Sequence, residues 1–437
     1  MTTLAEPELL VNEPVASLRS RRLMSLDALR GFDMFWIIGA GALVSALKRM
    51  SPGPLISFLG YELGHAQWEG FHFYDLIFPL FIFITGVSLV FSLSKSLDQT
   101  GREAVVKRLC RRSLLLYAAG IFYYGGFDNA WPGIRLVGVL QRIAIAYFFA
   151  GLLFCFFKPR TLVVICISLL ISYWAVMTFV PIRNIQMTKR NLVTLAANAS
   201  DAKTAALFAQ DGNPSTVKNS PVWAAAQEMY HATTNLVSAK YEPGLNVSDH
   251  ADFQYLPGRK YINFYDPEGL LSTIPAVATA LLGVFAGLLL RNPAVRDQRK
   301  IIYLISFGLA GLAMGWLWNL QFPVIKKIWT SSFVLVAGGY SALLLAAFYW
   351  LVDVLGFQRW CQPFVWIGTN SITIYLAENI TGGFDGIAAR FVGGDVKAWL
   401  DLHVARGFGD LIITLVGLLL ALLFVRLLYR QKVFLRF

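Results

Sequence analysis

The sequence contains the segment Gly64-His65-Ala66-Gln67-Trp68-Glu69-Gly70-Phe71-His72-Phe73-Tyr74-Asp75, which runs directly into the apolar stretch Leu76-Ile77-Phe78-Pro79-Leu80-Phe81-Ile82-Phe83-Ile84-Thr85-Gly86. The first part holds two of the five histidines of the chain, together with a glutamate and an aspartate. The second part predicts a helix that crosses a membrane. Titratable groups therefore stand at the entrance of a membrane-spanning segment.

The composition places the whole chain in the membrane class. Of its 437 residues 56% are hydrophobic and only 15% are charged, and the mean hydropathy is +0.57. A soluble domain carries roughly 25% charged residues. We therefore predict an all-α polytopic membrane protein with about ten transmembrane helices and an extracytoplasmic insert.

The net charge of +12 has a simple origin in such a protein. The basic residues cluster in short loops, where lysine and arginine set the orientation of the spans. Nucleic acid is therefore excluded as a partner. The four cysteines lack the spacing of zinc ligands, and no metal site is predicted.

The apolar runs divide the chain into four parts. Residues 1–24 form a tail, residues 25–180 contain the first five spans with the loop 49–75, residues 181–268 form a polar insert, and residues 269–437 contain the last five spans. The basic loops 95–112, 158–160 and 291–300 and the tail 426–436 fall on one face. The positive-inside rule predicts that this face and both termini are cytoplasmic. The His65 segment and the insert are then extracytoplasmic.

Two histidines compete for the carboxylate of Asp75. His72 lies three residues before it, so a continuous helix would make the two neighbours. His65 lies ten residues before it, about 15 Å along a straight helix, so a His65–Asp75 contact requires the chain to fold back near Gly70. A histidine held by a carboxylate is a competent general base near neutral pH. The alternative, a plain surface histidine, stays open at this point.

Arg142 is a charge inside a predicted span. It stands eight residues into the apolar run 134–157, roughly 12 Å deep. A charge there is costly and requires a reason. One reason is an ion pair with Asp33 or Asp75. The other is a clamp for a phosphate or carboxylate, since a guanidinium presents a planar fork of donors.

Other polar groups in the spans allow two readings each. Asn370 and Ser371 stand in the middle of the predicted ninth span, where small polar residues commonly bond neighbouring helices. Glu378 at the outer end of that span is a second acid or a solvated cap. Arg30 lies three residues from both Asp27 and Asp33, so a structural ion pair is as well supported as a chemical role.

Six motifs occur in order along the chain: Ser25-Leu26-Asp27-Ala28-Leu29-Arg30-Gly31; His65-Ala66-Gln67-Trp68-Glu69-Gly70 with Asp75-Leu76-Ile77-Phe78-Pro79; Gly138-Val139-Leu140-Gln141-Arg142-Ile143-Ala144; Tyr265-Asp266-Pro267-Glu268-Gly269-Leu270-Leu271-Ser272-Thr273-Ile274-Pro275; Lys326-Lys327-Ile328-Trp329-Thr330-Ser331-Ser332-Phe333; and Asn370-Ser371. In this combination the sequence resembles the heparan-α-glucosaminide N-acetyltransferase family and its bacterial relatives, within a wider transmembrane acyltransferase superfamily.

The resemblance implies transfer of acetyl from cytoplasmic acetyl-CoA to the amine of a terminal glucosamine on the far side of the membrane. It implies that His65 is the catalytic histidine and Asp75 its neighbouring acid. Together with the local chemistry it gives the remaining expected sites: Arg142, Gln141, Arg30, Asn370 and Ser371 for acetyl-CoA, and Trp68, Glu69, His72, Glu378 and Lys326 for the acceptor. The expected location is the inner membrane of a bacterium.

Several alternatives stay open from the sequence. A permease for amino sugars without chemistry and an O-acetyltransferase acting on a cell-envelope glycan are the rival functions. Direct transfer and an acetyl-histidine intermediate are both compatible with the residues. The expected partners are the lipid bilayer, acetyl-CoA and an amino-sugar or glycan acceptor, and a homodimer stays open.

Overall fold

The computed structural model describes residues 23–50, 53–210, 218 and 220–435. Seven helices in this part are long and apolar enough to cross a membrane, or eight if a bent pair counts as one span. The seven are α4 (Phe73–Tyr123), α5 (Val139–Phe156), α6 (Pro159–Phe179), α11 (Thr273–Arg291), α12 (Asp297–Trp318), α13 (Ser331–Phe348) with its π-helical extension to Val354, and α18 (Phe408–Arg430). The prediction of an all-α polytopic membrane protein is confirmed.

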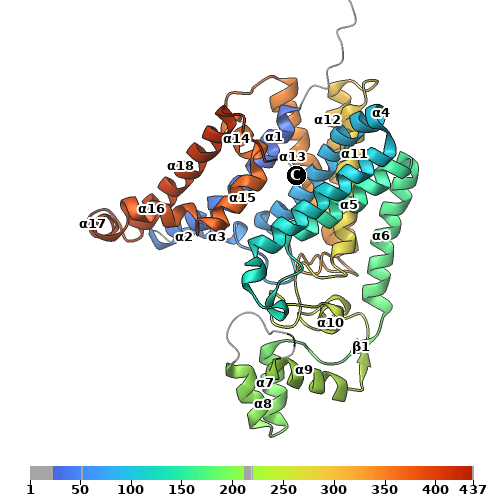
Figure 1. The fold of residues 1–437 in the computed structure, drawn as a ribbon, viewed down its shortest axis with the longest axis vertical. Helices are drawn as coiled ribbons and strands as arrows, with labels where there is room; N and C mark the ends of the chain where they lie inside the picture. Colours follow the sequence, from blue (N-terminus) through green and yellow to red (C-terminus); the bar gives the residue numbers. More distant parts are fainter. Residues whose placement is uncertain (1–22, 51–52, 211–217, 219, 436–437) are drawn as a thin grey trace, which may run out of the picture.

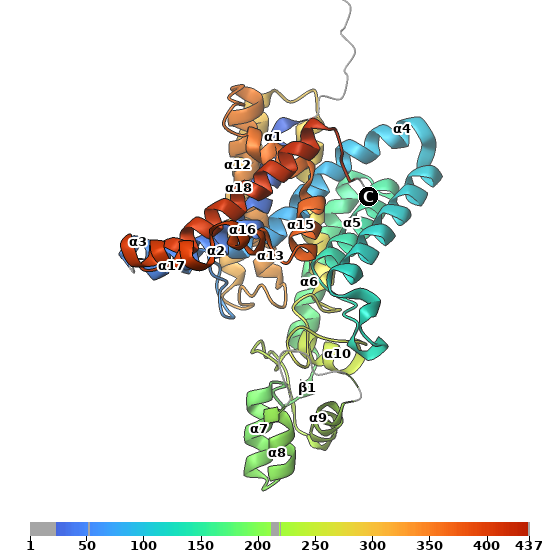
Figure 2. The same ribbon diagram turned by 60° about the vertical axis from the view of Figure 1, so that its left-hand side comes forward.

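The bent pair and two further features explain why this count is lower than ten. Helix α1 (Met24–Phe35) continues through a π-helical turn (Trp36–Ala40) into α2 (Gly41–Met50), with a bend of 51°. The predicted second and third spans are both contained in α4, which bends back at Gly101 (φ 76°, ψ 173°; Figure 2). The predicted ninth span is broken at Asn370 into α14 (Gln362–Thr369) and α15 (Ser371–Ile380). Neither piece has the ~20 residues that a helix needs to cross a bilayer alone.

Helix α4 packs closely on α11 in the centre of the bundle. A Cβ atom on Gly86 would lie 2.0 Å from the backbone oxygen of Ala280, and one on Gly283 would lie 2.0 Å from that of Phe83. Small residues let membrane helices approach to backbone contact, where dispersion and close packing hold them together. This packing holds α4, whose first turn carries Asp75, against α11.

The two ends of the bundle differ in content. Figure 1 shows the start of α1, the bend of α4 and the end of α18 at one end, and the insert at the other. The insert contains α7 (Lys189–Asn198), α8 (Ala202–Gln210), α9 (Pro221–Ala232) and α10 (Val247–Tyr255), with strands β1 (Ile182–Arg183) and β2 (Leu236–Val237) paired antiparallel. Its core is separate from that of the bundle and is built around Trp223, Phe253 and Phe264. The bend of α4 at Gly101 thus lies at the end of the bundle opposite the insert.

A lateral arm lies beside the bundle (Figure 1). It consists of α2, α3 (Pro54–Glu62), α16 (Phe384–Val392) and α17 (Gly394–His403). Helices α2, α16 and α17 pack on α18, and α3 packs on α2. Asp410 of α18 pairs with Arg49 of α2 and with Lys397 of α17. Since α3 leads directly into residues 63–72, the arm anchors the start of the segment that carries His65.

Candidate active site

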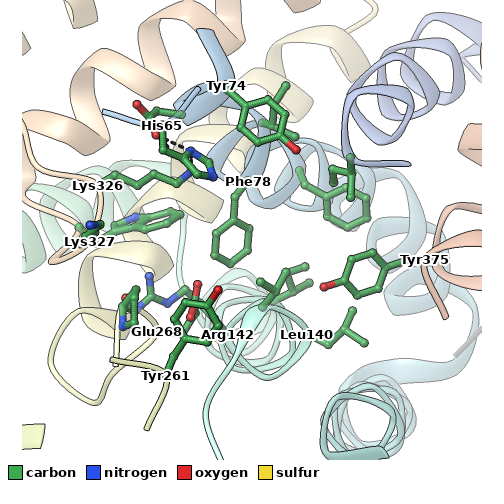
Figure 3. A pocket seen from close by; sticks show the side chains of 18 of the residues that line it. His65, Tyr74, Phe78, Leu140, Arg142, Tyr261, Glu268, Lys326, Lys327 and Tyr375 are labelled. Atoms are coloured by element: carbon green, nitrogen blue, oxygen red, sulfur yellow. Dashed lines mark hydrogen bonds and ion pairs between the residues drawn. The ribbon is translucent and has the colours of Figure 1, made fainter. Parts of the chain in front are cut away.

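A cavity of about 540 Å³ lies between α1, α4, α5, α15 and the loops that carry His65, Arg135, Glu268 and Lys326. Figure 3 shows His65, Lys326 and Lys327 along one side, Arg142, Glu268 and Tyr261 on another, and Leu140 and Tyr375 at the far end. The part formed by the loops is charged, whereas the part formed by the helices is apolar and includes Met34, Ile37, Phe81, Ile143 and Ile372. A site of this size and mixed lining suits a small ligand with one polar and one apolar portion.

The loop of residues 63–72, called the His65 loop below, folds back over the start of α4. Gly70 adopts φ 113°, in the region that favours glycine, and its N–H donates to the carbonyl of Val324 at 2.9 Å. Asp75, in the first turn of α4 and fully buried, accepts hydrogen bonds from the N–H groups of Ala66 at 3.0 Å and His72 at 3.1 Å. The fold-back that a His65–Asp75 contact requires is therefore present.

The imidazole of His65 meets the other oxygen of the same carboxylate. Its Nδ1 lies 2.8 Å from Oδ1 of Asp75, and its ring lies 4.8 Å from that of Tyr74. If Nδ1 carries the hydrogen, it donates to Asp75 and leaves the lone pair on Nε2, and Figure 3 shows the ring directed into the cavity. The histidine side chain is 52% exposed, so a substrate can reach it. The pair can act as an oriented general base.

Two lysines come from the loop between α12 and α13. Nζ of Lys326 lies 3.0 Å from Nδ1 of His65 and 3.3 Å from Oδ1 of Asp75. Burial lowers the pKa of Lys326, and the attraction of Asp75 opposes this effect. Lys327 donates to the carbonyl of Gln67 at 2.9 Å, and burial lowers its pKa as well. The two lysines thus bracket the His65 loop from the opposite half of the chain.

Arg142 also lines the cavity, but it lies less deep in its helix than expected, and its partners are not Asp33 or Asp75. Its Nη2 donates to the carbonyl of Pro267 at 2.8 Å and to Oγ of Ser272 at 2.5 Å, and its guanidinium lies 4.8 Å from the ring centre of Trp329. No ion pair with Asp33 or Asp75 forms, and neither carboxylate oxygen of Asp33 has a hydrogen-bond partner among the described residues. Of the two alternatives for Arg142, an ion pair with Asp33 or Asp75 is therefore not found among the described residues.

The predicted depth of Arg142 is wrong because α5 starts later than the apolar run. The helix begins at Val139, so Arg142 lies in its first turn. Residues 134–138 are instead held against the insert, where Arg259 donates its N–H to the carbonyl of Ile134 at 3.0 Å. This places Arg135 outside the helix, in a loop.

A buried ion network in the wall of the cavity was not predicted from the sequence. Arg135 donates to Asp266 at 2.9 and 2.7 Å and to Glu268 at 2.8 Å. Its guanidinium lies 4.3 Å from the ring centre of Tyr124. Burial, reinforced by Asp266, raises the pKa of Glu268. The Asp-Pro-Glu-Gly motif was the available signal, but the partners of Arg135 are 131 and 133 residues away.

The other residues expected to hold acetyl-CoA lie outside the cavity lining. Gln141 is fully buried against Gly120 and Gly138. Arg30 donates to Oγ of Ser88 at 2.6 Å and pairs with Asp27 at 3.7 Å. Asn370 and Ser371 are buried at the break between α14 and α15. Only Arg142 of this group is brought to the lining.

The residues expected to bind the acceptor mostly hold loops in place. Trp68 donates to the carbonyl of Tyr241 at 2.7 Å, and Glu69 forms a backbone bridge with Ile325. His72 precedes α4, and its Nδ1 lies 3.0 Å from the carbonyl of Gly64. Glu378 accepts from the N–H of Phe384 at 3.3 Å. Within the described residues, no group of three or more His, Cys, Asp or Glu side chains is arranged to hold a metal ion.

Fold and cavity define a multi-pass membrane protein with a histidine–carboxylate pair facing a partly apolar cavity. Residues 22–198 match the family described as "Heparan-alpha-glucosaminide N-acetyltransferase, catalytic". The mouse protein named heparan-alpha-glucosaminide N-acetyltransferase is 28% identical over 360 residues, covering 75% of this chain and 51% of its own length. The human protein of that name is 27% identical over 390 residues, covering 82% and 53%.

The chain therefore spans about half the length of the curated relatives it matches. The resemblance inferred from the motifs is confirmed as a distant one, carried by the match of residues 22–198 and by the similarity to the mouse and human proteins. The matched segment contains His65, Asp75 and Arg142, whereas Glu268 and Lys326 come from beyond it.

Proposed function

We propose that the protein is a membrane acetyltransferase that moves an acetyl group from acetyl-CoA to the amine of a glucosamine-type sugar. The observation that carries this proposal is the 2.8 Å contact between Nδ1 of His65 and Asp75 at the charged end of the cavity. The family match supports the acetyl donor and the amine acceptor as reaction partners.

The geometry supports a direct transfer with His65 as general base. Nε2 of His65 accepts a proton from the sugar amine as nitrogen attacks the carbonyl carbon of the thioester. The new C–N bond forms, the C–S bond breaks, and the proton passes to the leaving sulfur. Asp75 holds Nδ1–H throughout and stabilises the transient imidazolium. A route in which His65 briefly carries the acetyl group would use the same contacts.

The lining fits the acetyl donor. The apolar end offers a surface for an alkyl thioester arm, while Arg142 supplies a cation at the charged end. Its Nε is buried and has no hydrogen-bond partner in the described part of the chain, so the protein does not use all of its hydrogen-bonding capacity. For this reason we assign Arg142 to the binding of acetyl-CoA.

The proposed sidedness rests on the loops. Loops 95–112 and 158–160 contain most of their charge as lysine and arginine and lie at the end of the bundle opposite the insert (Figure 1). The positive-inside rule favours the cytoplasm for that end. The donor then enters from the cytoplasm, and the acceptor binds on the side of the insert.

The proposal is tested with purified protein, acetyl-CoA and a panel of amino sugars, read by mass spectrometry. His65→Ala should lower the rate by about 10²–10⁴-fold. His231→Ala is the matched control, because His231 is exposed on α9 and contacts Gln227 instead of the cavity. Undiminished transfer by His65→Ala would refute the assignment.

The same assay separates the rival functions. Accumulation of unmodified sugar in vesicles without acetyl-CoA, combined with no acetylated product, would identify a permease. A base-labile product would identify an O-acetyltransferase, whereas an amide survives the same treatment.

A further inference from the structure

Lys326 is fixed relative to His65 by backbone contacts between two loops. Gly70 donates to Val324 at 2.9 Å, and Glu69 bridges to Ile325 in antiparallel fashion. The residue after Ile325 is Lys326, whose side chain is only 20% exposed and reaches both members of the His65–Asp75 pair. The ammonium group is therefore a built part of the site, held from the second half of the chain.

The distances constrain which hydrogen bonds exist. Nδ1 of His65 lies 2.8 Å from Oδ1 of Asp75 and 3.0 Å from Nζ of Lys326. A neutral imidazole nitrogen either donates or accepts, and an ammonium only donates. If Nδ1 accepted from Lys326, its lone pair would face the carboxylate. All three groups are satisfied only when both Nδ1–H and Nζ–H donate to Oδ1 of Asp75.

We propose that Lys326 is a positioning residue that shares Asp75 with His65 and offsets its charge, rather than a contact to the acceptor. Asp75 alone would orient the imidazole, and its negative charge would also stabilise the imidazolium form. An ammonium 3.0 Å from Nδ1 repels the imidazolium and cancels part of that stabilisation. The imidazole thus keeps the orientation that Asp75 gives it, while the ammonium of Lys326 opposes a second positive charge beside it. This inference rests on the proposed function.

Other charged and titratable groups also face the imidazole. They are Tyr74 on α4, Lys327 on the loop of Lys326, Arg142 on α5, and Arg135, Tyr261 and Glu268 across the cavity. Of these, Lys327 offers the closest comparison, because it is the adjacent lysine and bonds to Gln67 instead of the His65–Asp75 pair.

The direct test measures the proton affinity of His65 without reference to activity. Diethyl pyrocarbonate modifies neutral imidazole, so the rate of His65 labelling, mapped by peptide mass spectrometry between pH 5 and 8, yields its midpoint. Lys326→Met should raise this midpoint by about one pH unit. Lys326→Arg should give the wild-type labelling midpoint. Lys327→Met should shift the midpoint less than Lys326→Met does. His231 serves as the internal reference, and Lys326→Gln replaces the methionine variant if that protein does not fold.

The kinetic test separates positioning from acceptor binding. Because His65 must be neutral to act as a base, the acid limb of kcat/KM should move to higher pH in Lys326→Met by the same amount, with an unchanged KM for the acceptor. An unmoved labelling midpoint and pH profile, together with a tenfold higher KM, would overturn the proposal and assign Lys326 to the acceptor. Absence of any acetyl transfer by the wild type would instead refute the proposed function. The labelling midpoint would still test the positioning role of Lys326, because it does not depend on activity.

Discussion

The indole N–H of Trp68 donates a hydrogen bond of 2.7 Å to the backbone carbonyl of Tyr241. Trp68 belongs to the His65 loop, and Tyr241 belongs to the insert. The contact ties the loop that carries the proposed base to a part of the chain outside the bundle. The insert is thereby a support for the site as well as a neighbour of the cavity.

Replacing Trp68 by phenylalanine removes this single bond and keeps an aromatic ring. We expect a loss of about 1 kcal/mol in the local stability of the His65 loop, the usual net worth of one hydrogen bond. Hydrogen exchange of residues 63–72 should become faster. Trp131→Phe is the control, because Trp131 is exposed in a separate surface loop. Equal protection in both variants would mean that the insert does not hold the loop.

Gly70→Ala tests the fold-back itself. A Cβ atom at φ 113° is strained whatever the surrounding space, at a cost of about 1–2 kcal/mol. We expect slower acetyl transfer and faster amide hydrogen exchange in residues 63–72. Gly64→Ala, at the other end of the same loop and without a positive φ, should have the smaller effect on both measurements.

Asp75→Asn keeps the shape of the side chain and removes its charge. The amide offers one oxygen where the carboxylate offers two, so it cannot serve His65 and both backbone N–H groups together. We expect kcat to fall by about 10²–10⁴-fold, with a smaller change in KM. A fall of less than threefold would show that Asp75 does not assist the base.

Arg135→Met leaves two carboxylates, Asp266 and Glu268, without their shared cation. Removing one partner of a buried ion pair costs about 3–5 kcal/mol. We expect a matching loss in the free energy of unfolding of the detergent-solubilised protein. Arg190→Met on the exposed face of α7 should change it by less than about 0.5 kcal/mol. Similar stabilities would contradict the role assigned to the network.

The insert should show a pH-dependent stability that originates in Asp249. Burial raises the pKa of this carboxyl from 3.8 to about 7, although it accepts hydrogen bonds from Gly244 and Asn246. A group whose pKa is higher in the folded state than in the unfolded state stabilises the folded state. This contribution is complete at pH values below the unfolded-state pKa, and it is lost as the pH rises through the folded-state pKa. The wild-type insert should therefore lose stability from about pH 4 to pH 7, by about 4 kcal/mol at most.

Asp249→Asn isolates this effect. The variant has no charge at this position and should gain stability relative to the wild type over the same pH range, measured by thermal unfolding. His250 acts in the opposite sense, since burial lowers its pKa to about 4 and its contribution is lost as pH falls. Because His250 is present in both proteins, its effect cancels in the difference. A difference that does not vary with pH would refute the assignment to Asp249.

The features readable from the sequence were those with local causes. The apolar runs predicted the polytopic class, and Gly70 allowed the fold-back that brings His65 to Asp75. Arg142 was placed too deep, because residues 134–138 are apolar enough for a helix yet are held extended by the insert. Glu268 was missed because its partner Arg135 is 133 residues away, a separation that no local pattern encodes.

The amide of Gly70 finds its acceptor only at Val324, late in the chain. A nascent polypeptide that has inserted α4 and α5 still lacks that carbonyl and the lysine beside it. Until the segment after α12 emerges from the ribosome, the imidazole of His65 can contact Asp75 but not the ammonium of Lys326. The order of synthesis thus makes assembly of the proton-transfer group one of the last events of maturation, after most of the bundle has entered the bilayer.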